Sequence, residues 1–375
     1  MSKKRKTDLL IIIIFLLGLY LPSLIFYCFC NGEGTNLENR ELAKFPNFTN
    51  ITKIPKEIED YYNDHLPFRN LLRQTWNNVN YLLFHTSVQE QVIVGKKDEK
   101  NMQWLFFSDK NAGDPIGDIT GYKKFTPKEL REIADQMQEN TENLKKQGIA
   151  LYYLLIPNKS SVYQEYLPNN IGIIGPTRMS VLNEYLQSLQ VKNYLCVEEI
   201  LKQGKEKYPT YYRTDTHWTA YGAYISMVEL VKKMDKKVCK EKCEEFNKTS
   251  KEVTKLKKES MDLKKLLGVS LEFVDEETDM SQFLANVKIE FKEKKYGTYN
   301  ILEAHSKNAY NSKKVLFIGD SFRKGTYDIL PKMFTDVVYI HVEDYQNSLL
   351  KEYNPDIIVY EVVERYIKRL QKNLT

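Results

Sequence analysis

The sequence predicts an α/β fold in which a parallel sheet carries helices on both faces, preceded by one N-terminal transmembrane helix. Short apolar runs alternate with helix-length segments through the last third of the chain. The run Ala150–Ile156 is apolar without alternation, which is typical of a strand buried on both faces. The uncharged apolar stretch Leu9–Cys30 is long enough to cross a bilayer, which takes about 20 residues.

The composition bounds the function. The 375 residues suffice for one large catalytic domain or two modest ones. A net charge of +5, from scattered residues, is too small to predict a nucleic-acid partner. The chain has no glycine-rich nucleotide-binding motif, so we expect no cofactor. Cys239 and Cys243 lack neighbouring histidines, so we expect no metal, and they either form a local disulfide or stay reduced.

The N-terminus predicts a signal anchor. Basic residues precede the apolar run, which keeps this end cytoplasmic and predicts an extracytoplasmic catalytic domain, periplasmic or at the cell surface. A cleaved signal peptide is the alternative, but the run is longer than a usual signal core and no small-residue cleavage site follows it. We therefore assign 1–30 to a cytoplasmic stub and anchor, 31–50 to a linker, and 51–375 to the catalytic domain.

Helices and strands follow in order. Pro55–Leu83 has helical periodicity interrupted at Pro67, and Gln91–Val94 with Trp104–Phe107 indicates a hairpin. A capping box at Thr126 begins a helix that should stop before Gly148.

Further elements continue to the C-terminus. A helix is expected after Pro176, a strand at Leu195–Val197, a helix from Glu198, a loop over Tyr211–Trp218 and a helix over Thr219–Met234. Residues 231–265, rich in Lys and Glu, suggest a solvated helical insertion or a partner surface. Strands Val315–Ile318, Asp336–Val342 and Asp356–Tyr360 then alternate with helices from Phe322, Glu343 and Val362.

Gly319-Asp320-Ser321 is a candidate nucleophile turn. It follows an apolar strand and precedes a helix, so the Ser321 hydroxyl should stand at the carboxyl end of a parallel strand. Free N–H groups at the start of that helix would stabilise an oxyanion. Asp and Ser are also ordinary helix caps, so the tripeptide alone is weak evidence.

Asp215-Thr216-His217-Trp218 supplies the missing base. In an extended loop, residues separated by one position project to the same side, so Asp215 can orient the imidazole of His217. Among the five histidines of the chain, only His217 lies so close to an acid in a polar loop. A surface histidine beside an aspartate is the unremarkable alternative.

Taken together, these motifs resemble the AlgX/AlgJ-like alginate O-acetyltransferase family, which has an SGNH hydrolase-like fold with Asp-x-His before the serine, a permuted order. The resemblance covers nearly the whole chain after the anchor. Further segments that match are Gly222–Tyr224, Glu38–Arg40, Asp64–Arg69, Val92–Gly95, Trp104–Phe106, Pro157–Lys159, Pro168, Met261–Leu263 and Pro355–Arg365. The longer hairpin turn after Gly95 and the Lys/Glu-rich insertion depart from the pattern.

The resemblance implies a catalytic triad of Ser321 as nucleophile, His217 as base and Asp215 as orienting acid. It implies acetyl transfer to hydroxyls of an extracellular or cell-wall polysaccharide through an acetyl-serine. The donor would be a partner, a multi-span membrane-bound O-acyltransferase. Candidates for the oxyanion or the substrate, each of which could equally be structural, are Phe322, Asn158, Lys159, Arg323, Glu361 and Arg365.

Two other functions are compatible with this sequence. The same triad with water as acceptor would be a polysaccharide acetyl-esterase, because only the attack on the acyl-enzyme differs. A non-catalytic scaffold of a polysaccharide modification complex would keep the fold without the chemistry. The polymer, the hydroxyl acetylated and the donor are beyond the sequence.

Overall fold

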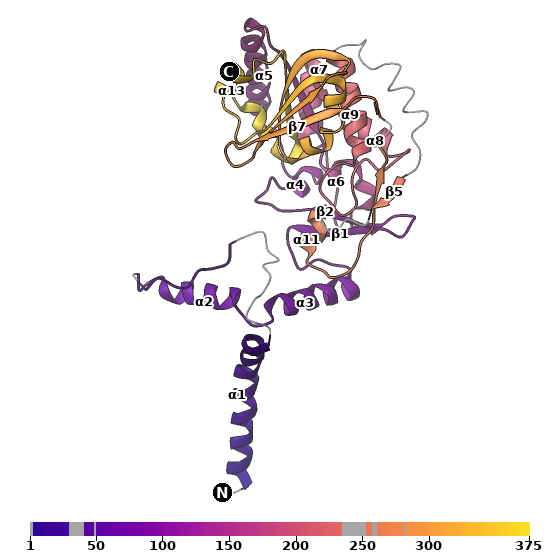
Figure 1. The fold of residues 1–375 in the computed structure, drawn as a ribbon. Coiled ribbons are helices and arrows are strands. Elements are labelled where there is room, and N and C mark those ends of the chain that lie inside the picture. The colour runs from indigo at the N-terminus through magenta and orange to yellow at the C-terminus, as the bar shows by residue number, and fades with distance from the viewer. Residues whose placement is uncertain (1–2, 30–40, 49, 235–252, 257–260, 281–282) are drawn as a thin grey trace. The chain divides into compact units, whose positions relative to one another are not determined.

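The computed structural model describes residues 3–29, 41–48, 50–234, 253–256, 261–280 and 283–375. These divide into two compact units (Figure 1). One comprises Met1–Gln89 with Lys264–Glu272, and the other comprises Glu90–Leu263 with Phe273–Thr375. The domain expected over 51–375 is thus divided between the two. Cys239 and Cys243 lie outside the described residues.

The N-terminal unit is helical. Its helices are α1 (Lys3–Phe29), α2 (Ile54–Asp64) and α3 (Arg69–Phe84). Within α1, the segment Thr7–Ile25 is apolar and long enough to cross a membrane, and none of it is buried. It is the single such helix among the described residues. The chain therefore carries one N-terminal candidate for a membrane span, as predicted.

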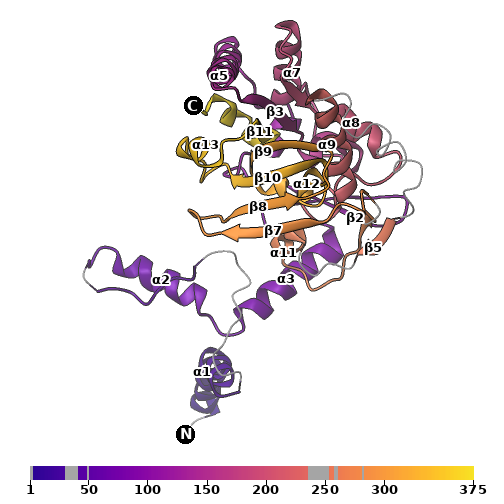
Figure 2. The same ribbon diagram turned by 45° about the horizontal axis from the view of Figure 1, so that its top comes forward.

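The larger unit is built on a seven-stranded sheet. The strand order is β4-β3-β11-β9-β10-β8-β7. Figure 2 shows this order from β3 to β7. The sheet strands are β3 (Ala150–Ile156), β4 (Tyr194–Cys196), β7 (Ile289–Lys294), β8 (Ile301–Ser306), β9 (Asn311–Gly319), β10 (Phe334–His341) and β11 (Ile357–Val363). Strands β4, β3, β11, β9 and β10 pair in parallel. Strands β8 and β7 extend this sheet at one edge by antiparallel pairing. The expected parallel sheet is confirmed, and its antiparallel edge was not predicted.

Helices cover both faces of this sheet. Successive side chains of a strand point to opposite faces, so neighbouring residues of β11 pack against different helices. Along β11, Val359 packs with α8, α9 and α12, whereas Ile358 and Tyr360 pack with α5, α7 and α13. The helices concerned are α5 (Pro127–Lys146), α7 (Arg178–Ser188), α8 (Glu198–Gly204), α9 (Ala220–Met234), α12 (Leu330–Met333) and α13 (Ser348–Tyr353). The sheet is therefore a middle layer between two hydrophobic cores.

The remaining elements are short. They are β1 (Val92–Lys97), β2 (Gln103–Phe107), α4 (Pro115–Ile119), α6 (Lys159–Val162), η1 (Gln164–Tyr166), β5 (Val253–Leu256), α11 (Asp262–Leu267), β6 (Asp275–Thr278), η2 (Ser321–Thr326) and η3 (Glu364–Gln371). Strands β1 and β2 form the expected hairpin, and β5 pairs antiparallel with β6. The capping box at Thr126 begins α5, which ends before Gly148 at φ +79°.

Three expectations about helices are wrong. The segments after Ser321 and Val363 are the 3₁₀ helices η2 and η3, and only the last part of Glu343–Tyr353 is helical. Fourteen residues separate β9 from β10 and fifteen separate β10 from β11, and these connections hold η2, α12 and α13, whereas η3 follows the last strand. The proposed helical insertion at 231–265 contains strand β5, while 235–252 and 257–260 lie outside the described residues.

The start of α9 packs closely on the loop before it. A Cβ atom added to Gly222 would lie 2.3 Å from the backbone oxygen of Thr210. We therefore predict that Gly222→Ala lowers the free energy of unfolding by about 1–3 kcal/mol, the usual cost of overpacking. The control is Gly172→Ala, because no atom lies within 4 Å of a Cβ there. Equal unfolding curves in urea for the two variants would contradict this close contact.

Candidate active site

The structure brings the three residues of the predicted triad together at the carboxyl end of the sheet. Ser321 follows Asp320, which comes directly after the end of β9. Nε2 of His217 lies 2.7 Å from Oγ of Ser321. Nδ1 of His217 lies 2.6 Å from Oδ1 of Asp215. The tautomer that satisfies both contacts donates from Nδ1 to Asp215 and accepts the Ser321 hydroxyl proton at Nε2. This is the connectivity that a serine nucleophile requires.

Asp215 is held in place from several sides. Its Oδ1 also accepts the backbone N–H of His217 at 3.0 Å, and its Oδ2 accepts the backbone N–H of Asp262 at 3.2 Å. Burial alone would raise its pKa, but the His217 ring and these N–H donors outweigh burial and lower the pKa of Asp215 to about 2. The carboxylate therefore stays ionised at neutral pH and faces the imidazole.

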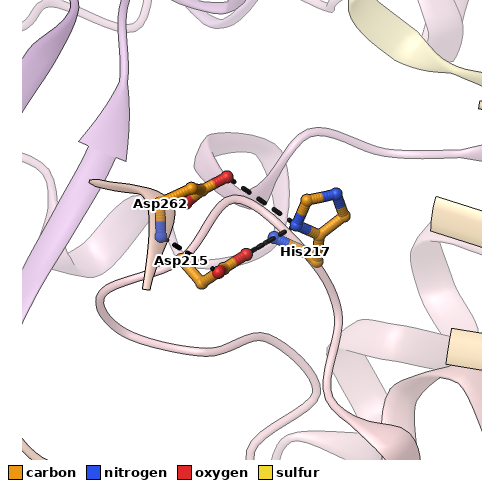
Figure 3. Close-up of side chains that lie close together, drawn as sticks. All are labelled: Asp215, His217 and Asp262. Carbon is orange, nitrogen blue, oxygen red and sulfur yellow. Dashed lines mark hydrogen bonds and ion pairs between the residues drawn. The ribbon is translucent and has the colours of Figure 1, made fainter. Parts of the chain in front are cut away.

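Asp262 is a second carboxylate at the same imidazole, which the sequence did not single out as a site residue. Its Oδ2 lies 3.7 Å from Nδ1 of His217 (Figure 3). Its carboxylate also accepts hydrogen bonds from the backbone N–H of Thr216 at 2.8 Å and from the Thr216 hydroxyl. Burial, and then the nearby charge of Asp215, raises its pKa. The only signal in the sequence was its place in the matching segment Met261–Leu263.

Asp215, His217 and Asp262 also form the one cluster of potential metal ligands found among the described residues. One ligand atom from each lies within 4.8 Å of the other two. A cation bound there would displace the Nδ1 proton that now bonds to Asp215. The metal arrangement and the triad arrangement therefore exclude each other.

Lys159 lies against the loop that carries Asp215 and His217. It is buried, and its Nζ donates to the backbone oxygens of Tyr212 at 3.1 Å, Arg213 at 3.0 Å and Asp215 at 2.7 Å. An ammonium has three N–H donors, and all three are used. Lys159 therefore binds the loop that carries the triad, which favours the structural alternative over a glycan contact.

Strand β6 binds the other side of the same loop. The carboxylate of Asp275 accepts from the backbone N–H groups of Arg213 at 2.5 Å and Thr214 at 3.1 Å. The Arg213 side chain forms ion pairs with Asp98 at 2.6 Å and Glu276 at 3.1 Å. The backbone oxygens of this irregular loop thus face an ammonium while its N–H groups face carboxylates.

The nucleophile turn is capped by its own aspartate. Oδ1 of Asp320 accepts the backbone N–H of Phe322 at 2.9 Å, so this predicted oxyanion donor is engaged here. The Phe322 ring lies 4.9 Å from the His217 ring, and its backbone oxygen accepts Nε1–H of Trp218 at 3.0 Å. Phe322 therefore connects the nucleophile turn to the histidine loop.

Asn158 lies at the end of β3, two strands from β9 in the sheet. Its backbone N–H donates to Oε2 of Glu364 at 2.8 Å. Its side-chain amide is buried and has no hydrogen-bond partner among the described residues. An unpaired buried amide costs about 1–3 kcal/mol, so this group is a candidate to bind a ligand.

Glu361 is buried beneath the nucleophile turn instead of facing a glycan. A Cβ on Gly319 would lie 2.2 Å from its Oε2, so the carboxyl group touches the backbone of the turn. Burial, and then the neighbouring Asp320, raises the pKa of Glu361 well above its ordinary value. The position of Glu361 favours the structural alternative over a glycan contact.

A cleft of about 220 Å³ opens beside Ser321. Its lining residues are Tyr299, Asp320, Ser321, Arg323, Lys324, His341, Glu343, Arg365, Tyr366 and Arg369. Of the predicted substrate contacts, Arg323 and Arg365 therefore share a cleft with the nucleophile. Arg323 is largely buried and donates to the backbone oxygen of Asp320 at 2.7 Å, whereas the Arg365 guanidinium lies 5.4 Å from the Phe322 ring.

The model of the family described as "SGNH hydrolase-like domain, acetyltransferase AlgX" matches residues 93–334. The chain belongs to this family. The match includes Asp215, His217 and Ser321, and it confirms the resemblance expected from the motifs.

Curated relatives agree with this assignment. The chain is 25% identical over 175 residues to the probable alginate O-acetylase AlgJ of Pseudomonas aeruginosa, covering 46% of this chain and 40% of that protein. It is 24% identical over 210 residues to the protein of that name from Pseudomonas syringae, covering 50% and 46%. The chain thus spans less than half the length of the curated relatives it matches.

A solved structure shows the same fold. PatB1 of Bacillus cereus with a sulfonyl adduct superposes with a TM-score of 0.51 at 14% identity, covering 75% of this chain and 100% of that chain.

Removing the Lys159 charge should disturb the triad loop. Lys159→Met leaves three backbone oxygens without their donor, each worth about 1–3 kcal/mol when buried. We expect the rate at which a fluorophosphonate probe labels Ser321 to fall at least about tenfold. The control is Lys128→Met, because that side chain is 85% exposed. Equal labelling rates for the two variants would contradict the role of Lys159.

The pH dependence of labelling tests the same contact. Burial lowers the pKa of Lys159 from 10.5 to about 8. Labelling of the wild type should fall as pH rises through about 8, and Lys159→Met should lack this fall. Between pH 8 and 10.5 the unfolded chain binds this proton more tightly, so the lysine's contribution to the free energy of unfolding rises with pH. Deprotonation of Lys159 therefore does not destabilise the fold, and unfolding does not explain the loss of labelling above pH 8.

Glu361 should be replaceable by a neutral group of its own shape. We expect Glu361→Gln to change the free energy of unfolding at pH 7 by less than about 1 kcal/mol, whereas Glu361→Ala should cost about 2–4 kcal/mol through the cavity it leaves. A raised carboxyl pKa makes stability fall as pH rises above the unfolded value near 4.5. Urea titrations across pH should show that this slope is smaller in Glu361→Gln.

Proposed function

We propose that this chain transfers acetyl groups to hydroxyls of an extracellular or cell-wall polysaccharide through an acetyl-serine intermediate. The observation that carries the proposal is the 2.7 Å contact between Ser321 Oγ and His217 Nε2, with Asp215 at the other ring nitrogen. Membership of the acetyltransferase AlgX family supports acyl transfer as the reaction class. Relatives named alginate O-acetylase support a polysaccharide as the acceptor, without making alginate the polymer here.

In the first step, Ser321 Oγ attacks the carbonyl carbon of the acetyl donor while its proton passes to His217 Nε2. The imidazolium is stabilised by the ionised Asp215. The bond between the acetyl carbon and the leaving group of the donor then breaks, and the leaving group takes the proton. In the second step, a sugar hydroxyl gives its proton to His217 and attacks the acetyl carbon. The acetyl–Ser321 bond breaks, and the serine recovers a proton from the imidazolium.

The tetrahedral intermediates need donors for their negative oxygen. The backbone N–H of Ser321 and the unpaired amide of Asn158 are the candidates that the geometry leaves open. The backbone N–H of Phe322 contributes only if Asp320 releases it, because that carboxylate now accepts its hydrogen bond.

The cleft beside Ser321 is the proposed acceptor site. Its aromatic residues Tyr299 and Tyr366 offer flat surfaces to a sugar ring, and Arg323 and Arg365 offer hydrogen-bond donors to its oxygens. The cleft is small, so it suits one or two sugar units of a longer polymer.

We further propose that a multi-span membrane-bound O-acyltransferase delivers the acetyl group across the bilayer. The candidate span Thr7–Ile25 would anchor the chain beside that partner. The basic residues before it favour a cytoplasmic N-terminus and an extracytoplasmic catalytic unit, in a single-pass protein of the cell membrane.

The test is direct detection of the acyl-enzyme. Purified full-length chain is incubated with an activated acetyl ester, and peptides are examined by mass spectrometry. We expect an acetyl adduct on Ser321 that accumulates without acceptor, disappears in Ser321→Ala, and forms at least about 100-fold more slowly in Asp215→Asn. The matched control, Ser188→Ala, changes an exposed serine on α7 and should behave as wild type.

Oligosaccharide acceptors separate the alternatives. Acetylated sugar supports transfer, whereas release of acetate alone supports an acetyl-esterase. If Ser321→Ala still acetylates the polymer in cells, the chain is a scaffold and the catalytic proposal fails.

A further inference from the structure

Helix α3 exposes its apolar side and covers its polar side. The exposed side chains of the helix include a stripe of large apolar residues, between 36% and 69% exposed: Leu71, Leu72, Trp76, Val79, Leu82 and Leu83. At 100° per residue, these six lie within about 140° of the helix circumference. We call this set the α3 stripe, and it contains no charged residue.

The opposite side of α3 is polar and packs within its own unit. Nδ2 of Asn77 donates to the backbone oxygen of Gly268 at 3.2 Å, and Asn78 exchanges hydrogen bonds with Ser270 at 2.8 and 3.0 Å. Asn77 and Tyr81 are the buried residues of the helix. The helix therefore cannot turn its stripe inward without breaking these contacts.

An uninterrupted apolar stripe of this size needs a cover, because soluble proteins seldom leave such patches to water. Leucines with a tryptophan on one side and a polar opposite side are typical of a helix that lies in the plane of a bilayer interface. Tryptophan is enriched at this depth because its ring is apolar while its N–H remains hydrated.

The chain itself brings this helix to a membrane. The candidate span ends at Ile25, and α3 begins at Arg69 in the same compact unit. The intervening residues tether the stripe near the bilayer surface, so its local concentration there is high. We propose that the α3 stripe lies in the headgroup region of the membrane into which Thr7–Ile25 inserts. This inference depends on that span and is independent of the catalytic proposal.

Trp76 provides the test. The chain has three tryptophans, and Trp104 and Trp218 are each only 2% exposed, whereas Trp76 is 58% exposed. Full-length chain is reconstituted into phosphatidylcholine–phosphatidylglycerol vesicles, with or without lipids brominated near the headgroup. The difference between wild type and Trp76→Phe isolates the emission of Trp76.

We expect the brominated lipid to quench the emission of Trp76 in the wild type. The double variant Leu72→Glu/Leu83→Glu should lift the stripe from the interface, so aqueous iodide should quench Trp76 about threefold less in the wild type than in this variant. The matched control, Ile174→Glu, places the same charge at a residue that is 85% exposed outside α3 and should match wild type. Protection from iodide without quenching by bromine would mean that protein covers the stripe, and full access to iodide would mean that nothing does. Either result overturns the proposal.

Discussion

The candidate site depends on how the loop from Tyr211 to Trp218 is held, because it carries Asp215 and His217 without regular secondary structure. A single isolated bridge joins its two ends, so its shape comes from side chains that bind its backbone. Lys159 is central among them, since one buried ammonium gathers the backbone oxygens of three loop residues. Asp275 holds the N–H groups of two neighbouring residues. The imidazole thus reaches Ser321 from a loop that is fixed on both sides.

The pKa values of two carboxyl groups of the site are shifted in opposite directions. Asp215 is surrounded by N–H donors and the imidazole, and these keep it ionised despite burial. Glu361 is buried beside Asp320, and burial, followed by this like charge, raises its pKa. Asp215 orients the base, whereas Glu361 fills space under the nucleophile turn.

Much of this arrangement was predictable from short patterns. Continuous apolar runs revealed the central strands, and the Asp-x-His pair with Gly319–Ser321 indicated the triad. Lys159 was a candidate, but its role, like that of Asp275, could not be predicted, because binding to backbone atoms leaves no pattern of residue types. Strand β7 could not be predicted for another reason. Five of its six residues are exposed and most are charged, so the strand has no apolar periodicity. Residue composition alone does not distinguish 3₁₀ segments such as η2 and η3 from α-helices.

The charged edge strand β7 affects how readily the protein associates with other chains. It ends the sheet, and an edge strand offers unpaired backbone groups to any extended segment nearby. Lysines and glutamates along Ile289–Lys294 oppose such strand addition, because a second chain would have to bury their charges. At the other edge, β4 is only three residues long. Both borders of the sheet thereby discourage self-association into fibrils.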